Sequence, residues 1–466
     1  MALLVMKFGG TSVGNPAAIA ALAAIVQQQR HAWDQVAVVV SAMSGVTDLL
    51  IKGAQTAAAG DAETFVAITA QLREKHLNTL AELAGHTTDT LDVGSAIEHL
   101  LNDFELLCRS VLVLGEVTPR ALDAIAGLGE RMSARLVAAA LRAGQLDATA
   151  IDASEVVVTT NDFGNAVPIY PHTRERIRER LLPLLSHGTV PVITGFIGAT
   201  TNGALTTLGR GGSDYSGAIF GAALDADEVA IYTDVDGVMT TDPRMARDAK
   251  IIAMLSYSEM AELAYFGAKV LHPRTIRPVV ERGIPLRIRN TFNADHCGTL
   301  VVRDVEPDGR FVKAVTSIKH MSLITVEGRG MIGVPGVAAR TFGAVASVGA
   351  NVLMISQASS EQSICFIVPS NTAAAVVDAL EDHLRQEIDR RDIDRINPRD
   401  GVVIVTAVGA GMRDTPGVAS QVFSALAKQH VNVVAIAQGS SECAISVVVR
   451  EADADTAVRA IHQLTL

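Results

Sequence analysis

The chain has 466 residues, of which 49% are hydrophobic and 4% aromatic, and its formal net charge is −11. This length suggests two to four domains, and an acidic balance without a basic stripe gives no electrostatic basis for broad binding to nucleic acids or anionic membranes. The four cysteines form no CxxC pair or metal-ligand spacing, which suits a reducing, cytoplasmic location. The opening run MALLVMKF is too short for a signal peptide or a membrane span, so we interpret it as a buried first strand.

The first 300 residues alternate strand-like and helix-like segments. Apolar runs typical of buried strands lie at 3–8, 36–42, 190–196, 228–235 and 285–290. Alanine-rich stretches with helical periodicity lie at 17–29, 131–143 and 214–225. This alternation predicts an α/β fold with a mostly parallel sheet sandwiched by helices. Ligands in such folds bind at the carboxyl ends of the strands, where this sequence places many of its glycines and polar residues.

The segment KFGGTS, residues 7–12, follows the first predicted strand. Lys7 places an ammonium at the strand end, and Gly9 and Gly10 allow backbone N–H groups to approach an anion, as a phosphate cradle requires. A plain glycine turn beside a surface lysine is the alternative interpretation. The segment is not a Walker A motif, because GxxxxGK[ST] occurs nowhere in the chain.

The segment TLGRGGSDYSG, residues 207–217, leads a cationic turn into an apolar helix. Arg210 offers a planar fork that suits a carboxylate. Ser213 is suited to cap the helix, whose dipole favours negative charge near Asp214. A mobile glycine loop capped by serine is the alternative. Taken alone, the segment fits a carboxylate site and this alternative equally well.

Other candidate residues have ordinary structural roles when taken alone. Glu130, in LGERMS, starts an apolar helix where the dipole favours a carboxylate in any case. Phe196, in GFIG, suits a core or a pocket wall. The stretch YTDVDG at 232–237 lacks EF-hand spacing and is interpreted as a nucleotide-handling loop or a plain turn. Lys269, in FGAKVLHP, is typical of a solvated charge at a helix end.

An internal duplication organises the last third of the chain. Residues 327–368 align with residues 408–449 without a gap, with 19 identities in 42 positions. Each copy reads as a short strand, a Pro-Gly turn, an apolar helix and two strands, and an alanine-rich stretch supplies a second helix. This order predicts two ferredoxin-like βαββαβ units.

The predicted domains follow from these patterns. We expect an α/β domain at 1–305, a linker at 306–318, a first ferredoxin-like unit at 319–400 and a second at 401–466. Strand exchange between the two ferredoxin-like units is compatible with this division. The linker assignment depends on the polar segment around Pro307, Asp308 and Gly309.

Taken together and in this order, the motifs resemble the aspartate kinases of the amino-acid kinase family. The resemblance is carried by KFGGTS, VVVSAMSGVTD, GERMS, VITGFIGA, TTLGRGGSDYS, YTDVDGVMTTDPR, FGAKVLHPRT and the two QxSSE-bearing repeats. It covers essentially the whole chain, and the repeats resemble tandem ACT domains. It implies ATP-dependent phosphorylation of the side-chain carboxylate of L-aspartate with Mg²⁺, the entry step to lysine, threonine and methionine.

The resemblance also implies roles for individual residues. The implied catalytic residues are Lys7 and Asp214. The implied aspartate contacts are Ser41, Thr47, Glu130, Phe196, Arg210 and Ser213. The implied nucleotide contacts are Lys7, Gly9, Gly10, Thr233, Asp234, Met239, Arg244 and Lys269. Met239 departs from the family, which commonly has tyrosine there, so this chain lacks one phenolic hydrogen bond to the nucleotide.

The ACT resemblance implies binding of an end-product amino acid at subunit contacts of a homodimer or larger homo-oligomer. The implied effector contacts are Met331, Gly336, Asn351, Gln357 and Gln438. The QASSE and QGSSE segments favour threonine as effector, with lysine second. Two other functions remain open: a sister amino-acid kinase acting on another acidic substrate, and a catalytically silent amino-acid sensor.

Overall fold

The computed structural model describes residues 1–466 except 85–87, 268–270, 272, 306–309, 333, 358–361, 414, 440–442 and 466. The chain divides into two compact units. The first contains Met1–Val238, Ala253–Tyr257 and Val270–Asp304, and the second contains Met239–Ile252, Ser258–Lys269 and Val305–Leu466.

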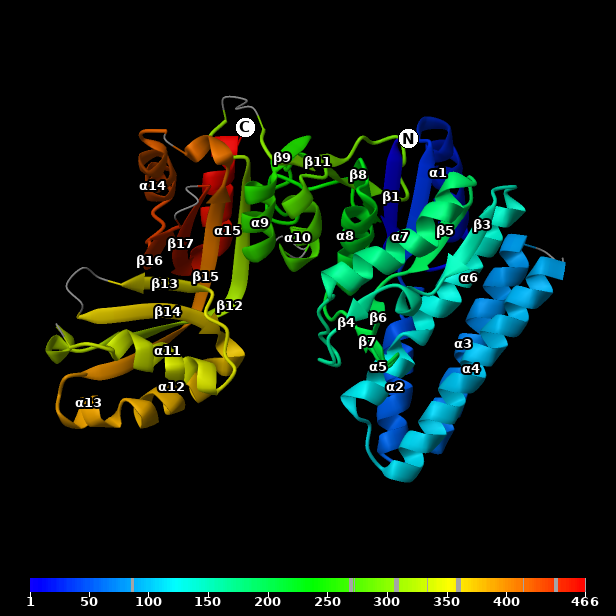
Figure 1. Ribbon diagram of the computed structural model, residues 1–466. Helices are drawn as coiled ribbons and strands as arrows, with labels where there is room; N and C mark the ends of the chain where they lie inside the picture. The colour runs from blue at the N-terminus through cyan, green and yellow to red at the C-terminus, as the bar shows by residue number, and fades with distance from the viewer. Residues whose placement is uncertain are drawn as a thin grey trace. The chain divides into compact units, whose positions relative to one another are not determined.

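An eight-stranded sheet forms the centre of the first unit (Figure 1). Its strands are β1 (Leu3–Phe8), β2 (Gln35–Val40), β3 (Ala148–Ile151), β5 (Val190–Thr194), β8 (Glu228–Thr233), β9 (Met254–Ser256), β10 (Leu286–Asn290) and β11 (Thr299–Val302). The order across the sheet is β3-β5-β2-β1-β8-β10-β11-β9, and only β10 and β11 pair antiparallel. The prediction of a mostly parallel sheet is confirmed.

Helices cover both faces of this sheet, and its central strands are therefore buried on both sides. Leu4, Met6 and Phe8 of β1 share a hydrophobic cluster with α1 (Pro16–Ala32) and α6 (Leu128–Ala143). Alternation along the strand directs Lys7 to the opposite face. There it meets α8 (Gly212–Leu224), on which α7 (Tyr170–Ser186) and α10 (Pro273–Arg282) pack. The helices predicted at 17–29, 131–143 and 214–225 are therefore confirmed.

Further helices and a small sheet complete the first unit. The long helices α3 (Ala62–Ala84) and α4 (Thr88–Leu114) lie side by side, and α2 (Val46–Ala58) contacts both (Figure 1). The approach of α2 to α4 requires glycine at position 53, since a Cβ there would lie 2.6 Å from Cζ of Phe104. After α5 (Pro119–Ala126), the strands β4 (Val158–Thr159), β6 (Ile197–Thr200) and β7 (Leu205–Thr207) form a three-stranded sheet.

The second unit contains a six-stranded antiparallel sheet (Figure 1). Its strands are β12 (Ala314–Glu327), β13 (Met354–Gln357), β14 (Ser363–Pro369), β15 (Arg395–Val408), β16 (Ala435–Gln438) and β17 (Ala444–Arg450), in the order β13-β14-β12-β15-β17-β16. Its helices are α9 (Tyr257–Tyr265), α11 (Val337–Ser347), α12 (Ser370–His383), α13 (Arg385–Asp389), α14 (Val418–Lys428) and α15 (Ala454–His462). The two repeats have the element order that the duplication predicted.

The strands β12 and β15 each run through both repeats. The second half of β12, Met321 to Glu327, pairs with β14, whereas residues 314–318 pair with residues 404–408 of β15. Val312 and Val315 are buried in the core of the second repeat. The segment expected as a linker at 306–318 therefore overlaps the start of β12 and contributes Val312 and Val315 to that core. The second repeat obtains a sheet strand from the segment that precedes the first repeat.

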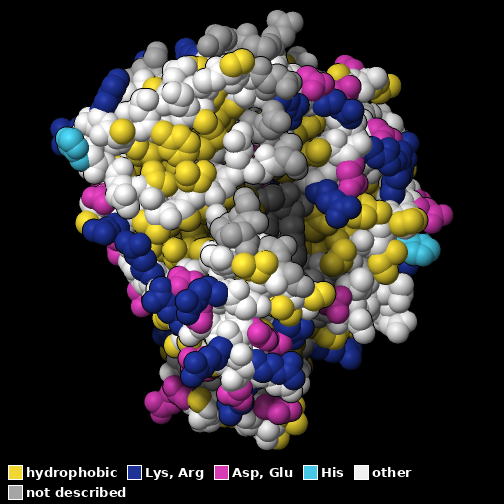
Figure 2. Space-filling view, turned by 90° about the vertical axis from the view of Figure 1, so that its left-hand side faces the viewer, with side chains coloured by type: hydrophobic (Ala, Val, Ile, Leu, Met, Phe, Trp, Pro, Cys, Tyr) yellow, Lys and Arg dark blue, Asp and Glu magenta, His cyan; other side chains and the backbone are white. Residues whose placement is uncertain are grey.

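The face of the molecule shown in Figure 2 is mixed in charge. On the face shown in Figure 2, lysine and arginine side chains are interspersed with aspartate and glutamate, and patches of hydrophobic side chains lie between them. In the second unit, Ile355 and Ile436 are about half exposed on the two end strands of the sheet, β13 and β16. None of the helices in the described ranges combines the length and the apolar character needed to cross a membrane.

Candidate active site

Lys7 lies near the carboxyl end of β1, with only 6% of the residue exposed. Its Nζ forms an ion pair with Oδ1 of Asp214, which lies in the first turn of α8. The helix can approach so closely because residue 217 is glycine: a Cβ there would lie 3.0 Å from Cβ of Lys7. The structure therefore places the two expected catalytic residues in direct contact.

The glycine turn after β1 packs against two neighbouring segments. The N–H of Gly9 donates to the carbonyl oxygen of Tyr232 at 3.1 Å, so it is already occupied. A Cβ on Gly9 would lie 3.6 Å from Nζ of Lys7, and a Cβ on Gly10 would lie 3.3 Å from the carbonyl oxygen of Ala42. The N–H of Gly9 is therefore already used within the chain, and the absence of a side chain leaves space beside the Lys7 ammonium.

Glu130 is a buried carboxylate in the first turn of α6, and 3% of the residue is exposed. Its Oε1 accepts a hydrogen bond from the N–H of Ala42 at 3.1 Å, while Oε2 has no hydrogen-bond partner among the described residues. Burial raises the pKa of Glu130 to about 8, although the Ala42 N–H and the charge of Lys7 oppose the shift. A buried carboxylate oxygen without a partner is costly, so the site is suited to receive a cation from outside.

Phe196 and Ser213 lie on neighbouring segments at the start of α8. Phe196 has φ +67°, an uncommon conformation for a bulky side chain, and its N–H donates to Oγ of Ser216 at 2.9 Å. A Cβ on Gly212 would lie 2.7 Å from the Phe196 ring, and a Cβ on Gly195 would lie 3.1 Å from Cβ of Ser213. Two glycines thus allow the Phe196 turn to lie against the first turn of α8.

Arg210 is exposed between Gly209 and Gly211, which both have φ +73°. Such a backbone is accessible to glycine at little cost, so the turn can present the arginine outward. Arg210 forms no ion pair within the part of the chain that the structure describes.

Two further expected substrate contacts follow β2. Ser41 is half-buried, and its N–H donates to the carbonyl oxygen of Phe8 at 3.1 Å, which fixes it beside the end of β1. Thr47 is half-buried in the first turn of α2, after Gly45 at φ +78°. The structure therefore brings both residues to the strand ends that also carry Lys7.

The expected nucleotide residues are divided between the two units. Thr233 ends β8 and its hydroxyl donates to Asp234, which is exposed. Met239 and Arg244 belong to the second unit, where Met239 bridges to Ile251 and Arg244 pairs with Asp242 at 2.6 Å. Lys269 lies outside the described residues.

The expected effector residues have unequal access to solvent. Gln357 and Gln438 are exposed at the ends of the equivalent strands β13 and β16, and Asn351 is exposed shortly before β13. Gly336, at φ +88°, caps the N-terminus of α11. Met331 is 3% exposed and packs in the core of the first repeat. Its side chain therefore fills the core, which leaves only its backbone for an effector contact.

Sequence reasoning missed Asp123, a buried acid in α5. Its carboxylate binds Thr207, three residues before Arg210. The available signal was an acidic residue within the apolar stretch ALDAIAGL, seven positions before Glu130.

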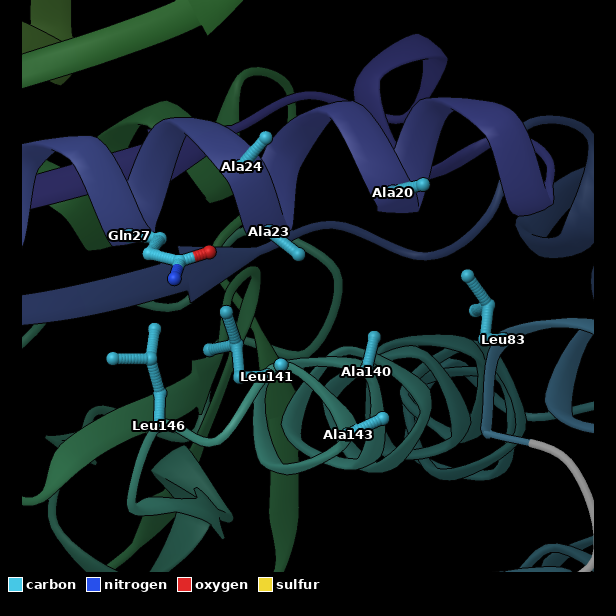
Figure 3. A pocket seen from close by; sticks show the side chains of 10 residues that line it. Ala20, Ala23, Ala24, Gln27, Leu83, Ala140, Leu141, Ala143 and Leu146 are labelled. Carbon is cyan, nitrogen blue, oxygen red and sulfur yellow. The ribbon is translucent and has the colours of Figure 1, made fainter.

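One cavity of about 330 Å³ lies between α1 and α6, away from these residues (Figure 3). Its lining is mostly alanine and leucine, and Gln27 is the polar side chain that Figure 3 labels there. The cavity therefore lacks the charged groups that an anionic substrate requires.

Comparison with known proteins agrees with this geometry. The family model for the amino acid kinase family matches residues 2–290, and an ACT domain model matches residues 324–384 and 405–464. Bifunctional aspartokinase/homoserine dehydrogenase 1 of Arabidopsis thaliana is 40% identical over 467 residues, covering 98% of this chain and 50% of that protein. The chain thus spans about half the length of the bifunctional plant relatives that it matches.

Two solved structures resemble the whole chain. E. coli aspartokinase III in complex with aspartate and ADP has a TM-score of 0.80 and 30% identity, and the match covers 99% of both chains. The same enzyme in complex with lysine and aspartate has a TM-score of 0.79 and 31% identity, again over 99% of both chains. Because the kinase family model covers more than half of the chain and these relatives match it nearly end to end, the chain belongs to the amino acid kinase family and, within it, to the aspartokinases.

Proposed function

We propose that the chain transfers the γ-phosphoryl group of ATP to the side-chain carboxylate of L-aspartate, giving 4-phospho-L-aspartate and ADP. The observation that carries the proposal is the unpartnered, buried Oε2 of Glu130 near the buried ammonium of Lys7. Ala42 is close to both Glu130 and the glycine turn that follows Lys7. Its N–H donates to Oε1 of Glu130, and its carbonyl oxygen lies against the turn at Gly10. An amino acid held by Glu130 would therefore lie beside the turn expected to hold phosphates.

Aspartate brings one cation and two anions, and the site offers a partner of opposite charge for the cation and for one of the anions. Oε2 of Glu130 would accept the α-ammonium, and the exposed guanidinium of Arg210 would bind the α-carboxylate as a fork. The hydroxyls of Ser41, Thr47 and Ser213 would orient the molecule, with Phe196 as a wall. E. coli aspartokinase III was solved with aspartate and ADP, which supports this choice of ligands.

The chemical step requires no general base. A side-chain carboxylate with an ordinary pKa of about 3.9 is already ionised at neutral pH. One of its oxygens attacks the γ-phosphorus while the bond to the β,γ-bridging oxygen breaks, and ADP leaves with that electron pair. Lys7, held by Asp214, would offset the charge that develops on the transferring phosphoryl group. Most of the rate enhancement would come from positioning two anions together.

The nucleotide would be bound by Lys7, Gly9, Gly10, Thr233, Asp234, Met239, Arg244 and Lys269. Mg²⁺ prefers oxygen ligands, and the carboxylates of Asp214 and Asp234 belong to that donor class. When bound, the ion would neutralise phosphate charge. Met239 would pack against the purine without a phenolic hydrogen bond.

We propose that this reaction is the entry step to lysine, threonine and methionine, and that an end-product amino acid regulates it through the ACT repeats. Gln357 and Gln438, exposed at equivalent strand ends, would bind polar groups of the effector. Threonine is the first candidate because of the QASSE and QGSSE segments, and lysine is the second. The E. coli relative solved with lysine supports an amino-acid effector. A homodimer or larger homo-oligomer, built through the ACT units, would carry this regulation.

Substrate choice tests the proposed reaction. ADP release should require L-aspartate and should not occur with L-glutamate or N-acetyl-L-glutamate at equal concentration. Release with glutamate or N-acetylglutamate instead would assign the chain to a sister kinase. Release with none of the three acids would favour the silent sensor.

Effector choice is tested by titration. Threonine should reduce the rate or raise the aspartate requirement, and Gln357→Ala or Gln438→Ala should weaken this response. Gln429→Ala, at an exposed helix end outside the strand ends, serves as the matched control and should respond like the wild type. A rate that is insensitive to threonine and falls with lysine would replace the effector assignment.

A further inference from the structure

Asp123 lies in the middle of α5 and is 3% exposed, yet its carboxylate makes three hydrogen bonds to other segments. Its Oδ2 accepts from the N–H of Gly164 at 2.9 Å and from the N–H of Thr207 at 3.0 Å. Its Oδ1 accepts from the hydroxyl of Thr207 at 2.7 Å. One buried side chain therefore joins α5, the 160–167 segment and the last residue of β7.

The segments joined by Asp123 also contact each other where the Arg210 turn begins. The N–H of Ala166 donates to the carbonyl oxygen of Thr207 at 2.9 Å. Gly209 lies so close to the 164–165 turn that a Cβ would be 2.8 Å from Oδ1 of Asn165. The N–H of Gly212 donates back to the carbonyl oxygen of Gly209 at 2.9 Å, which closes the turn around Arg210.

The same helix leads directly to Glu130. The N–H of Gly127 donates to the carbonyl oxygen of Asp123 at 3.1 Å, and Gly127 both ends α5 and precedes α6, whose first turn carries Glu130. Asp123 is thus connected on one side to the turn that presents Arg210 and on the other to the helix start that presents Glu130.

We propose that Asp123 is a positioning residue that sets the distance between Arg210 and Glu130, and hence the fit of the α-carboxylate and α-ammonium of the amino-acid substrate. This inference rests on the proposed aspartate kinase activity. Without the carboxylate, three donors lose their acceptor, of which the N–H and the hydroxyl of Thr207 are buried, and the Arg210 turn is no longer fixed to α5. Asp123 itself contacts no substrate, so the effect should appear in aspartate binding and leave ATP binding nearly unchanged.

Three variants remove different numbers of the hydrogen bonds to the Asp123 side chain. Thr207→Val removes one hydrogen bond and keeps the shape of the side chain. Asp123→Asn keeps an acceptor for the two N–H groups and can donate to the Thr207 hydroxyl, so it retains most of the geometry. Asp123→Ala removes all three bonds. Thr173→Val is the matched control, because the Thr173 hydroxyl is equally buried but binds the N–H and carbonyl of Val158 instead of Asp123.

The measurement is steady-state KM and kcat for aspartate and for ATP, with thermal unfolding of each variant. We expect the KM for aspartate to rise about threefold to tenfold in Thr207→Val and about 100-fold in Asp123→Ala, with a KM for ATP within about twofold of the wild type. Asp123→Asn should reverse most of the rise in the KM for aspartate seen in Asp123→Ala, and Thr173→Val should leave this KM unchanged.

An unchanged KM for aspartate in Thr207→Val and Asp123→Ala, or equal rises for both substrates, would overturn the positioning role. If Asp123→Ala fails to fold, the KM for aspartate in Thr207→Val decides the question. If the wild-type protein does not phosphorylate aspartate, the proposed function itself fails, which is a different result from an active wild type with unaffected variants.

Discussion

Nζ of Lys7 forms an ion pair with Oδ1 of Asp214, and this pair joins the carboxyl end of β1 to the first turn of α8. The side chains are 8% and 20% exposed. A lysine held in this way is oriented before substrates arrive, so little reorganisation is needed when negative charge develops beside it. The chemistry proposed here depends on this fixed charge.

Lys7→Ala should lower kcat by about 100-fold to 1,000-fold, the usual cost of removing one preorganised charge donor. Asp214→Ala should also lower kcat, because it releases the lysine from its fixed position. Both effects are measured as steady-state kcat, with far-ultraviolet circular dichroism as the control for folding. Near-normal turnover in both variants would contradict the catalytic assignment.

Glu130→Gln should stabilise the protein near neutral pH while weakening aspartate binding. Burial raises the pKa of Glu130 to about 8 from an ordinary value near 4.5. Between these two values the folded state holds a proton that the unfolded state has released, so the free energy of unfolding falls as pH rises. Glutamine has no proton to lose, so the free energy of unfolding of Glu130→Gln lacks this pH dependence. Its excess over the wild-type value should grow by at most about 1.4 kcal/mol per pH unit across this window.

Urea unfolding of the wild type and Glu130→Gln at several values between pH 5 and pH 8 measures this difference. A difference in the free energy of unfolding that stays constant across the window would contradict the raised pKa. In the wild type, aspartate binding should release a proton below pH 8, because the substrate ammonium favours the ionised carboxylate. Calorimetry in buffers of different ionisation enthalpy detects that proton.

Gly217→Ala should reduce turnover, because the new Cβ would lie 3.0 Å from Cβ of Lys7 and would displace the lysine. Gly343→Ala is the matched control: Gly343 lies within α11, and a Cβ there has no neighbour within 4 Å. The control should gain about 0.5–1 kcal/mol of stability from higher helix propensity. Equal kcat for Gly217→Ala and the wild type would show that the contact with Lys7 tolerates the methyl group.

Arg287→Ala should destabilise the first unit by about 1–2 kcal/mol, because it removes two parallel hydrogen bonds to Glu228 across β8 and β10, at 2.8 Å and 3.0 Å, from a partly buried pair. Arg277→Ala, which breaks an exposed pair with Glu281, is the control and should change stability by less than about 0.5 kcal/mol. Chemical denaturation measures both. Similar losses of stability in the two variants would mean that burial and the paired hydrogen bonds add nothing to the contribution of the Arg287–Glu228 pair.

The sequence predicted much of the site because local patterns determined it. KFGGTS and TLGRGGSDYSG combine glycines with charges at strand ends, and parallel strands bring those ends to one edge of the sheet. That pattern predicted both segments at the carboxyl ends of the strands, whereas the roles of Lys7 and Asp214 were implied by the resemblance to the aspartate kinases. Periodicity likewise predicted the main strands and helices, and the duplication predicted the repeated ferredoxin-like units.

Features that depend on distant contacts could not be predicted in the same way. The strand at 314–318 pairs with residues 404–408, and nothing local distinguishes such a strand from a linker. The raised pKa of Glu130 depends on how completely the fold buries it, and the role of Asp123 depends on partners 41 and 84 positions away. The burial of the Met331 side chain in the core of the first repeat likewise depends on the packing of distant segments.

The most direct test of the central claim is trapping of the acyl phosphate by hydroxylamine. The protein, ATP, Mg²⁺ and L-aspartate are incubated with hydroxylamine, and the aspartyl hydroxamate is identified by mass spectrometry against the β-hydroxamate standard. The account predicts the β-hydroxamate from the wild-type protein and a loss of at least about 100-fold with Lys7→Ala. Absence of the β-hydroxamate with the folded wild-type protein, or undiminished formation with Lys7→Ala, would contradict it.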